Sequence, residues 1–323
     1  MMLRANTGLA AAATIALCVA AASLPFLGVS AYLTALVYYA ALYLALGQAW
    51  NLMSGLTGYV SFAHGALAGV GAYAAVIILN AGYPVAFGLM AGVAASALAS
   101  LFISITSLLL RGVAFTFATL FFQELALLFT RKLEITGGAG GLVLSKIMPV
   151  WLPYVLMVAT ASSATLLVLV LLNSRAGIRL LAIKNDEDAA AAIGIEARSR
   201  KVVVFCASAI ICGLVGGTHA LFTSALYPDV VFQVDLSLIA LAVPMIGGVG
   251  TAFGPVLGAI LYMGAREILQ VIAPALHLII VGFLILLVTL LLRDGLGPEL
   301  LRLWRRMRVR NVQVAPPQRG ATL

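Results

Sequence analysis

The chain has 323 residues, of which 63% are hydrophobic and 9% are charged, whereas soluble proteins carry roughly 45–50% apolar and about 25% charged residues. Its 19 basic and 11 acidic side chains cannot cover the surface of a soluble protein of this length, which excludes a soluble globular fold. A membrane protein built of helices follows, because only helices and closed barrels satisfy their backbone groups in lipid and the alternating strand pattern of a barrel is absent.

Six apolar runs precede Ser174, and each is long enough for a helix that crosses a bilayer, which needs ~20 residues. The first run has features of a secretory signal peptide, but it is longer than a usual signal core, so we expect a retained span. Six crossings return the chain at Ser174 to the side on which Arg4 lies. The runs cover approximately residues 8–27, 29–50, 55–79, 83–110, 112–130 and 147–173.

The basic residues cluster in two segments. Six of the 19 lie between residues 174 and 201, and seven more lie between residues 293 and 319. Cytoplasmic segments of membrane proteins are enriched in Lys and Arg, so we expect both clusters in the cytoplasm. The net charge of +8 therefore marks topology and contact with the lipid bilayer, and no nucleic-acid partner is expected. The expected parts are a transmembrane domain over residues 1–292 with a cytoplasmic loop at 174–201, and a basic cytoplasmic tail over residues 293–323.

Three apolar runs follow the basic loop, at 202–226, 236–271 and 274–292. Three simple crossings would leave the basic tail outside the cell, so we expect the second run to break into two short or re-entrant pieces near Gly247 to Pro255. Broken helices are tolerated in a membrane where they line a cavity. The predicted fold is an all-α, polytopic transmembrane helical bundle of about eight to ten spans with broken or re-entrant Gly-rich segments.

The sequence lacks the motifs of common hydrolases and nucleotide-binding proteins. No Lys follows a Gly, which excludes a Walker A loop, and HExxH, GxSxG and SxxK are absent. Cys18, Cys206 and Cys212 lie in apolar runs without CxxC spacing, so neither a metal site nor a disulfide is expected. We therefore expect no catalytic residue, no cofactor bound by this chain and no enzymatic activity of its own.

Polar side chains within the apolar runs are candidates for a transport pathway. Ser61 and His64 are three residues apart and can share a helix face beside Gly65 and Gly69, whose spacing of four residues makes a smooth stripe for helix packing. A pathway and an ordinary packing histidine both account for His64. A second glycine series, for packing or for a re-entrant segment, comprises Gly250, Gly254 and Gly258.

Glu124 is an ionisable residue inside an apparent span, where a central charge costs about 2.5–3.5 kcal/mol. A role in the pathway or in interhelical hydrogen bonding accounts for it, and so does snorkelling with pairing to Lys132 near the outer end of the run. Thr116, in the same run, is a further pathway candidate. Arg266 and Glu267 are interpreted as flanking charges at a helix end.

Residues 184–201 predict a short helix in the cytoplasmic loop. Asn185 is the expected N-cap, three acidic residues occupy the first turn, four alanines continue the helix and Gly194 ends it. The helix would have about eight residues and a length near 12 Å. A partner that moves this rigid element could tilt the two attached spans, although a plain connector would have the same sequence features.

Four segments resemble the LivM-type permeases of branched-chain amino acid ABC importers. They are RGVAFTFATLFFQE (111–124), TGGAGGL (136–142), SRAGIRLLAIKNDEDAAAAIGI (174–195) and GGVGTAFGPVLGA (247–259). SFAHGALAGVGAY, at residues 61–73, is similar to the family's early Ser-Phe-Gly-His motif, with Ala63 in place of the usual glycine. The matches run in the family's order from about residue 51 to residue 268.

The resemblance implies a bacterial inner-membrane importer in which residues 1–292 are a permease domain and residues 174–201 are its coupling loop. The partners would be a LivH-like second permease, two ATP-binding subunits that carry ATP-Mg, and a periplasmic solute-binding protein that delivers solute near Thr136 to Leu142. The loop helix resembles the coupling helix of importer permeases, whose Glu-Ala-Ala-x-x-x-Gly pattern is matched here with Asp in place of Glu. The coupling residues would be Asp186, Glu187, Asp188, Ala189, Ala190 and Gly194.

Other functions stay open on sequence alone. Permeases of the same architecture carry urea, short amides or aromatic acids, and the sequence does not distinguish these solutes. An ion-coupled secondary transporter that works alone would leave the loop helix unexplained. An intramembrane enzyme would need clustered catalytic residues, and His64, Glu124 and His219 show no recognised spacing.

Overall fold

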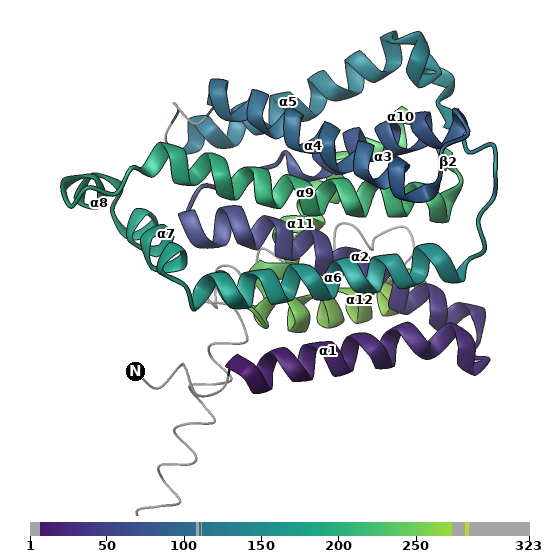
Figure 1. Ribbon diagram of the computed structural model, residues 1–323, viewed down its shortest axis with the longest axis horizontal. Coiled ribbons are helices and arrows are strands. Elements are labelled where there is room, and N and C mark those ends of the chain that lie inside the picture. Colours follow the sequence, from purple (N-terminus) through teal and green to yellow (C-terminus); the bar gives the residue numbers. More distant parts are fainter. Residues whose placement is uncertain (1–6, 108–109, 111, 273–281, 284–323) are drawn as a thin grey trace, which may run out of the picture.

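The computed structural model describes residues 7–107, 110, 112–272 and 282–283, and these residues form a bundle of helices (Figure 1). Among them, eight helical segments are long and apolar enough to cross a membrane, which confirms the polytopic all-α fold. The segments contain α1 (Thr7–Ser23), α2 (Ala31–Trp50), α4 (Val85–Ser107), α5 (Val113–Lys132), α6 (Trp151–Leu172), α9 (Ala197–Thr223), α11 (Val234–Gly247) and α12 (Gly254–Ile272). Helix α3 (His64–Asn80) is shorter and also apolar. Apart from residues 282 and 283, the span expected at 274–292 and the tail at 293–323 lie outside the described residues.

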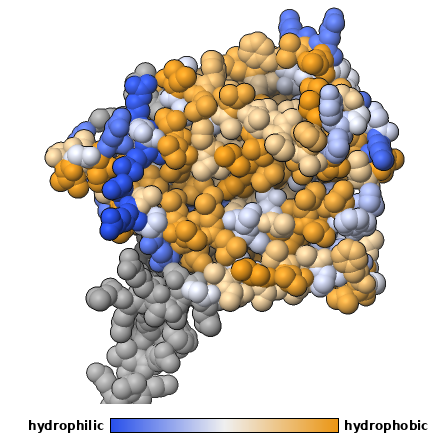
Figure 2. Space-filling model, viewed as in Figure 1, coloured by the Kyte–Doolittle hydropathy of each residue, from blue (hydrophilic) through white to orange (hydrophobic). Residues whose placement is uncertain are grey.

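The surface divides into an apolar band and polar ends. Figure 2 shows hydrophobic side chains over the middle of the visible face and hydrophilic side chains gathered toward its two ends. Large apolar side chains such as Phe102, Phe121 and Ile260 are exposed. A surface of this kind is unfavourable in water and favourable in the hydrocarbon core of a bilayer, so the chain is a multi-pass membrane protein.

Helices α3, α4 and α9 pack closely because glycines face one another where the helices cross. A Cβ atom on Gly71 would lie 2.7 Å from the Cα atom of Gly213, and one on Gly216 would lie 1.8 Å from the carbonyl oxygen of Ala68. A Cβ on Gly213 would lie 2.7 Å from the Gly92 carbonyl oxygen. Small residues allow this approach of backbones, which is the usual basis of helix packing in membranes.

The helical path through α2 breaks before α3 begins. Helix α2 continues into a π-helical turn, η2 (Asn51–Gly55), and the chain is non-helical from Gly58, at φ 79°, to Ala63. Within the apolar run expected at 55–79, helix α3 therefore begins only at His64. Gly58 adopts a conformation that a helix does not contain, and polar groups of other elements bond the backbone groups that the break frees. We call residues 51–63 the first break.

A second break divides the 236–271 run at the place that the sequence predicts. Helix α11 ends at Gly247 and α12 begins at Gly254. Gly248 and Gly250, at φ 134° and 76°, supply conformations that other residues rarely adopt. Helix α11 has 14 residues and is short, as expected, whereas α12 has 19 and is long enough to cross the membrane. We call residues 248–253 the second break.

The two ends of the bundle differ in structure (Figure 1). At the end that we call the α8 end, α7 (Arg175–Asn185) and α8 (Glu187–Ala192) connect α6 to α9. At the opposite end, the strand end, β1 and β2 pair in antiparallel fashion with Leu142 opposite Leu226. Helix α9 runs from one end to the other, and its 27 residues span about 40 Å. The remaining short elements are η1 (Leu24–Leu27), η3 (Glu134–Thr136), η4 (Gly138–Gly140), β1 (Leu142–Val143), β2 (Ala225–Leu226) and α10 (Pro228–Val231).

Helix α8 begins one residue later than the sequence predicts. Asn185 ends α7, and the N-cap of α8 is Asp186, whose carboxylate accepts the backbone N–H groups of Asp188 and Ala189, both at 3.0 Å. The expectation of an Asn185 cap and about eight residues is thus wrong, because the carboxylate of Asp186 caps a helix of six residues. Gly194, at φ 80°, lies just beyond the end of the helix, as expected.

Candidate functional site

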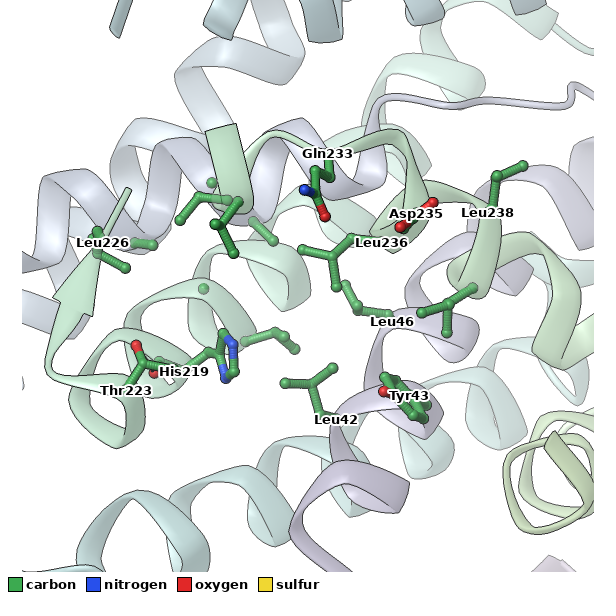
Figure 3. A pocket seen from close by; sticks show the side chains of 18 of the residues that line it. Leu42, Tyr43, Leu46, His219, Thr223, Leu226, Gln233, Asp235, Leu236 and Leu238 are labelled. Carbon is green, nitrogen blue, oxygen red and sulfur yellow. The ribbon is translucent and has the colours of Figure 1, made fainter. Parts of the chain in front are cut away.

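A cavity of about 570 Å³ lies among α2, α3, α9, α11 and α12, toward the strand end (Figure 3). Its wall includes Thr223 at the end of α9, Leu226 of β2 and Val230 of α10. The segment 136–142 reaches the same end of the molecule, because Leu142 begins the strand that pairs with β2. A cavity of this size is large enough for a small organic solute.

Most of the cavity wall is apolar. Leu42 and Leu46 of α2 and Leu236 of α11 gather in the middle of the cavity, between His219 on one side and Tyr43 on the other (Figure 3). An aliphatic side chain placed among these leucines would leave water for an apolar surrounding, which favours binding by roughly 25 cal/mol for each Å² buried. The cavity is therefore suited to a solute with an aliphatic part.

Two opposite charges line the same cavity. Asp235, in the first turn of α11, is exposed there, and Arg266 enters from α12. Nη1 of Arg266 donates to the hydroxyl of Tyr43, and the guanidinium lies 5.7 Å from the centroid of that ring. Tyr262 of α12 also lines the cavity. The interpretation of Arg266 as a flanking charge is wrong, whereas Glu267 bonds to the hydroxyl of Tyr32 outside the cavity.

His219 lines the α9 side of the cavity, and Tyr38 and Phe222 pack behind it. Nδ1 of His219 lies 3.2 Å from the hydroxyl of Tyr38, and the Tyr38 ring stacks on Phe222 with centroids 3.8 Å apart. Tyr38 is fully buried, and its hydroxyl is the hydrogen-bond partner of the imidazole. The imidazole of His219 is therefore a hydrogen-bonded polar group in the cavity wall, beside the leucines.

Ser61 and His64 lie in and beside the first break and do not line the cavity. Ser61 precedes α3, which begins at His64, so the two side chains do not share a helix face as expected. Both residues are fully buried. The His64 ring lies near the backbone of Ala49 and Ser61, but within the described part of the chain neither ring nitrogen makes a well-formed hydrogen bond.

Thr116 and Glu124, on α5, also lie away from the cavity. The Thr116 hydroxyl donates to the carbonyl oxygen of Val60 in the first break at 3.0 Å, and Glu124 is exposed on the outer face of α5. The neighbouring Gln123 is fully buried, and its Oε1 lies 2.6 Å from the Ser237 hydroxyl of α11. Gln123 was not predicted, because an uncharged amide costs less in an apolar run than a carboxylate and is therefore a weaker signal of function.

Gly65 and Gly69 lie on the side of α3 that faces α11 and the cavity. The N–H of Gly65 donates to the Ser237 hydroxyl at 2.9 Å, and that hydroxyl lies 2.6 Å from the Phe62 carbonyl oxygen. Gly69 lines the cavity, and a Cβ there would lie 2.6 Å from the ring of Phe232. Larger residues at these positions would separate α3 from α11.

The second glycine series surrounds the second break. Gly250 lies within the break, and its N–H donates to Oδ1 of Asn51 at 2.7 Å. Gly254 begins α12. Gly258 packs on α11, where a Cβ would lie 1.8 Å from the Val243 carbonyl oxygen. The three glycines thus lie where α11, α12 and the first break meet.

The coupling candidates lie at the α8 end, opposite the cavity. Ala190 is buried and Glu187 is partly buried, whereas the others face outward. The exposed members are Asp186, Asp188, Ala189 and Gly194. The structure thus places this set on a protruding element that another subunit could contact.

An all-helical, multi-pass chain with a solute-sized cavity between its helices has the architecture of a membrane permease. Over residues 32–289 the chain matches the family described as the permease component of branched-chain amino acid transport systems, and it belongs to that family. The resemblance to LivM-type permeases is thereby confirmed.

Two relatives are high-affinity branched-chain amino acid transport system permease proteins named LivM. The protein from Escherichia coli (strain K12) is 28% identical over 266 residues, and that from Salmonella typhimurium (strain LT2) is 27% identical over 264 residues. Each comparison covers 71% of this chain and 61% of the relative, so the chain spans about three fifths of the length of these relatives. No solved structure matches the chain.

Proposed function

We propose that this chain is one transmembrane subunit of an ATP-driven ABC importer that carries branched-chain amino acids across the bacterial inner membrane. The proposal rests mainly on the chemistry of the cavity. Its wall is largely apolar and also includes the charged side chains of Arg266 and Asp235. Family membership supports the same solute class, since the relatives are named as branched-chain amino acid permease proteins.

The cavity chemistry fits an amino-acid zwitterion with an aliphatic side chain. The guanidinium of Arg266 presents N–H donors in a planar fork that matches a carboxylate, and the carboxylate of Asp235 is an acceptor for an α-ammonium group. The leucines of α2 and α11 would surround the aliphatic side chain. Tyr43 holds the guanidinium through its hydroxyl, which limits the rotational freedom that Arg266 loses when solute binds.

The partners of the importer follow from this role. A LivH-like permease would complete the pathway, two ATP-binding subunits would hold ATP-Mg and dock at the α8 end, and a periplasmic solute-binding protein would dock at the strand end. The basic loop 174–201 and the tail at 293–323 would then be cytoplasmic, and segment 136–142 would lie on the periplasmic side with the cavity. This chain would do no covalent chemistry.

The test is the concentration dependence of leucine uptake by the assembled transporter. We expect Arg266→Gln to raise the KM for leucine at least tenfold, because charge-assisted hydrogen bonds contribute about 1.5–3 kcal/mol. Asp235→Asn should raise it less, since Asp235 is exposed. Glu267→Gln, on the same helix but outside the cavity, is the matched control. An unchanged KM in Arg266→Gln would contradict the proposal.

Competition separates the alternative solutes. Unlabelled isoleucine and valine should displace labelled leucine, whereas urea and short amides, which carry neither charge, should not. Displacement by urea or by an aromatic acid at equal concentration would instead assign the permease to another solute class. An ion-coupled secondary transporter would carry leucine without any ATP-binding subunit.

A further inference from the structure

Lys201 places a positive charge in the protein interior at the α8 end. It lies in the second turn of α9, and only 2% of its side chain is exposed. A buried ammonium group is costly unless it is paired. Its Nζ lies 2.8 Å from Oε1 of Glu187 in α8 and 4.1 Å from the ring centroid of Tyr59 in the first break. Lys201 therefore holds α8 and the first break together.

The carboxylate of Glu187 is shared between two elements. Its Oε1 accepts from Lys201, and its Oε2 accepts from the hydroxyl of Tyr59. The Tyr59 ring packs edge-on against Phe115 of α5, with centroids 5.4 Å apart. A displacement of α8 must therefore move Tyr59 or disturb both hydrogen bonds at once. We call Tyr59, Glu187 and Lys201 the buried cluster.

Lys184 attaches the same loop to the same break at a second point. It lies in the last turn of α7, and its Nζ donates to the carbonyl oxygen of Gly55 at 2.8 Å. Gly55 ends the π-turn η2. A Cβ on Gly58 would lie 3.3 Å from Cγ of Lys184, so the lysine stem packs directly on the break. Both helices of the loop thus contact the first break.

Asn51 joins the first break to the second. Its Nδ2 donates to the carbonyl oxygen of Thr251 at 2.8 Å, and its Oδ1 accepts from the N–H of Gly250 at 2.7 Å. Gln48, in the preceding turn, donates to the carbonyl oxygen of Ala252 at 2.7 Å. The second break connects α11 and α12, which carry the two charged residues of the cavity. A continuous series of contacts thus runs from α8 to the helices around the cavity.

We propose that the buried cluster transmits movement of α8 to the first break and, through Asn51, to α11 and α12. The inference rests on the proposed function, since α8 is moved only if an ATP-binding subunit docks on it. Tyr59, Glu187 and Lys201 are positioning residues in this role, because none of them lines the cavity.

The physical character of the cluster suits transmission. Its bonds are charge-assisted and partly buried, and separating Lys201 from Glu187 would leave a buried ammonium group without its partner. The cluster therefore moves as a unit. The first break lacks part of the helical hydrogen-bond ladder, and a helix bends where that ladder is interrupted. A push on α8 would be converted there into a tilt of the adjoining spans.

Tyr59→Phe is the sharpest test, because it removes one hydroxyl and keeps the ring. The full transporter is reconstituted in proteoliposomes with its ATP-binding subunits and binding protein, and ATP hydrolysis and leucine uptake are measured together. We expect hydrolysis to stay within twofold of the wild type and leucine carried per ATP to fall at least fivefold. The matched control, Tyr83→Phe, changes an exposed tyrosine between α3 and α4 and should leave the ratio unchanged.

A second measurement reports the transmission itself, even where activity is low. Hydrogen exchange is compared between the nucleotide-free complex and the complex trapped with ATP and vanadate. In the wild type, residues 58–63 and 186–194 should change together, whereas in Tyr59→Phe only residues 186–194 should change.

The outcomes separate the two proposals. Equal changes at residues 58–63 in both proteins, or an unchanged ratio of leucine to ATP in Tyr59→Phe, would overturn the inference and leave the importer role intact. A wild-type complex that hydrolyses ATP without carrying leucine would overturn the proposed function, and the inference with it.

Discussion

The two ends of the bundle are built on different physical principles. At the α8 end the fully buried Lys201 forms an ion pair with Glu187 and lies over the ring of Tyr59. Loss of either charged partner would leave the other charge unpaired inside the protein. At the strand end the charges of Asp235 and Arg266 face a cavity, and Asp235 is exposed to it. The charges at the α8 end are paired with each other inside the protein, whereas those at the strand end are accessible to a small molecule in the cavity. This difference fits the proposed importer, in which ATP-binding subunits dock at the α8 end and solute binds toward the strand end.

The largest expected effect is on stability at the α8 end. Glu187→Ala would leave the ammonium of Lys201 buried without its carboxylate, which costs about 3–5 kcal/mol of unfolding free energy. Asp235→Ala at the strand end should change it by no more than about 0.5 kcal/mol, because surface-like positions tolerate substitution. Thermal unfolding of the purified complex measures both, and the double variant Glu187→Ala/Lys201→Met should recover most of the loss. Equal effects of the two single variants would remove the contrast between the ends.

Gly194→Leu should uncouple hydrolysis from uptake without loss of expression. Among the described residues, no neighbouring heavy atom lies within 4 Å of the place that a Cβ at Gly194 would occupy, so the strain comes from φ 80° alone. A left-handed conformation costs a branched residue about 1–2 kcal/mol, so the end of α8 would shift and leucine carried per ATP would fall severalfold. Gly194→Asn, which tolerates this conformation, should keep near-wild-type coupling. Wild-type coupling in Gly194→Leu would argue that α8 is a plain connector.

Tyr43→Phe should raise the KM for leucine a few-fold and leave the ratio of leucine to ATP unchanged. The variant removes the hydroxyl that accepts from Arg266, so the guanidinium loses more rotational freedom when solute binds, while the guanidinium itself remains. The same uptake and hydrolysis assays measure both quantities. A change in the ratio with constant KM would show that the strand end also takes part in coupling.

Glu124→Gln is expected to have the smallest effect. Glu124 lies on the exposed face of α5, away from the cavity, so uptake should stay within twofold of the wild type. Gln123→Leu, at the adjacent buried position bonded to Ser237 and Phe232, should lower uptake more. A tenfold loss in Glu124→Gln would support its prediction as a pathway residue.

Sequence patterns predicted the features that depend on local chemistry. The break between α11 and α12 was predicted from the glycines at 247–250 and from the expectation that the basic tail is cytoplasmic, and α11 does end at Gly247. Gly194 predicted the end of the loop helix, and α8 ends two residues before it, at Ala192. The low charge content predicted a membrane protein, because so few charged residues cannot solvate a folded chain, and the long apolar runs predicted a polytopic helical bundle.

Features that depend on tertiary contacts were not predictable in this way. The first break lies inside an apolar run, and its free backbone groups are bonded by distant side chains such as Trp50 Nε1, which donates to the Ser61 carbonyl oxygen, and Thr119, whose hydroxyl accepts from Phe62. The cavity joins Leu42 to Arg266, which are far apart in the sequence. No periodicity within one helix reveals such a neighbour.

ATP-dependent accumulation of leucine in proteoliposomes is the decisive measurement for the proposed ATP-driven import of leucine through this chain. Proteoliposomes that contain the assembled transporter are loaded with ATP-Mg and given labelled leucine with the binding protein outside. Accumulation should require enclosed ATP and should persist when ionophores dissipate every ion gradient. Accumulation without ATP that collapses when the ionophores are added would contradict the account and identify an ion-coupled transporter.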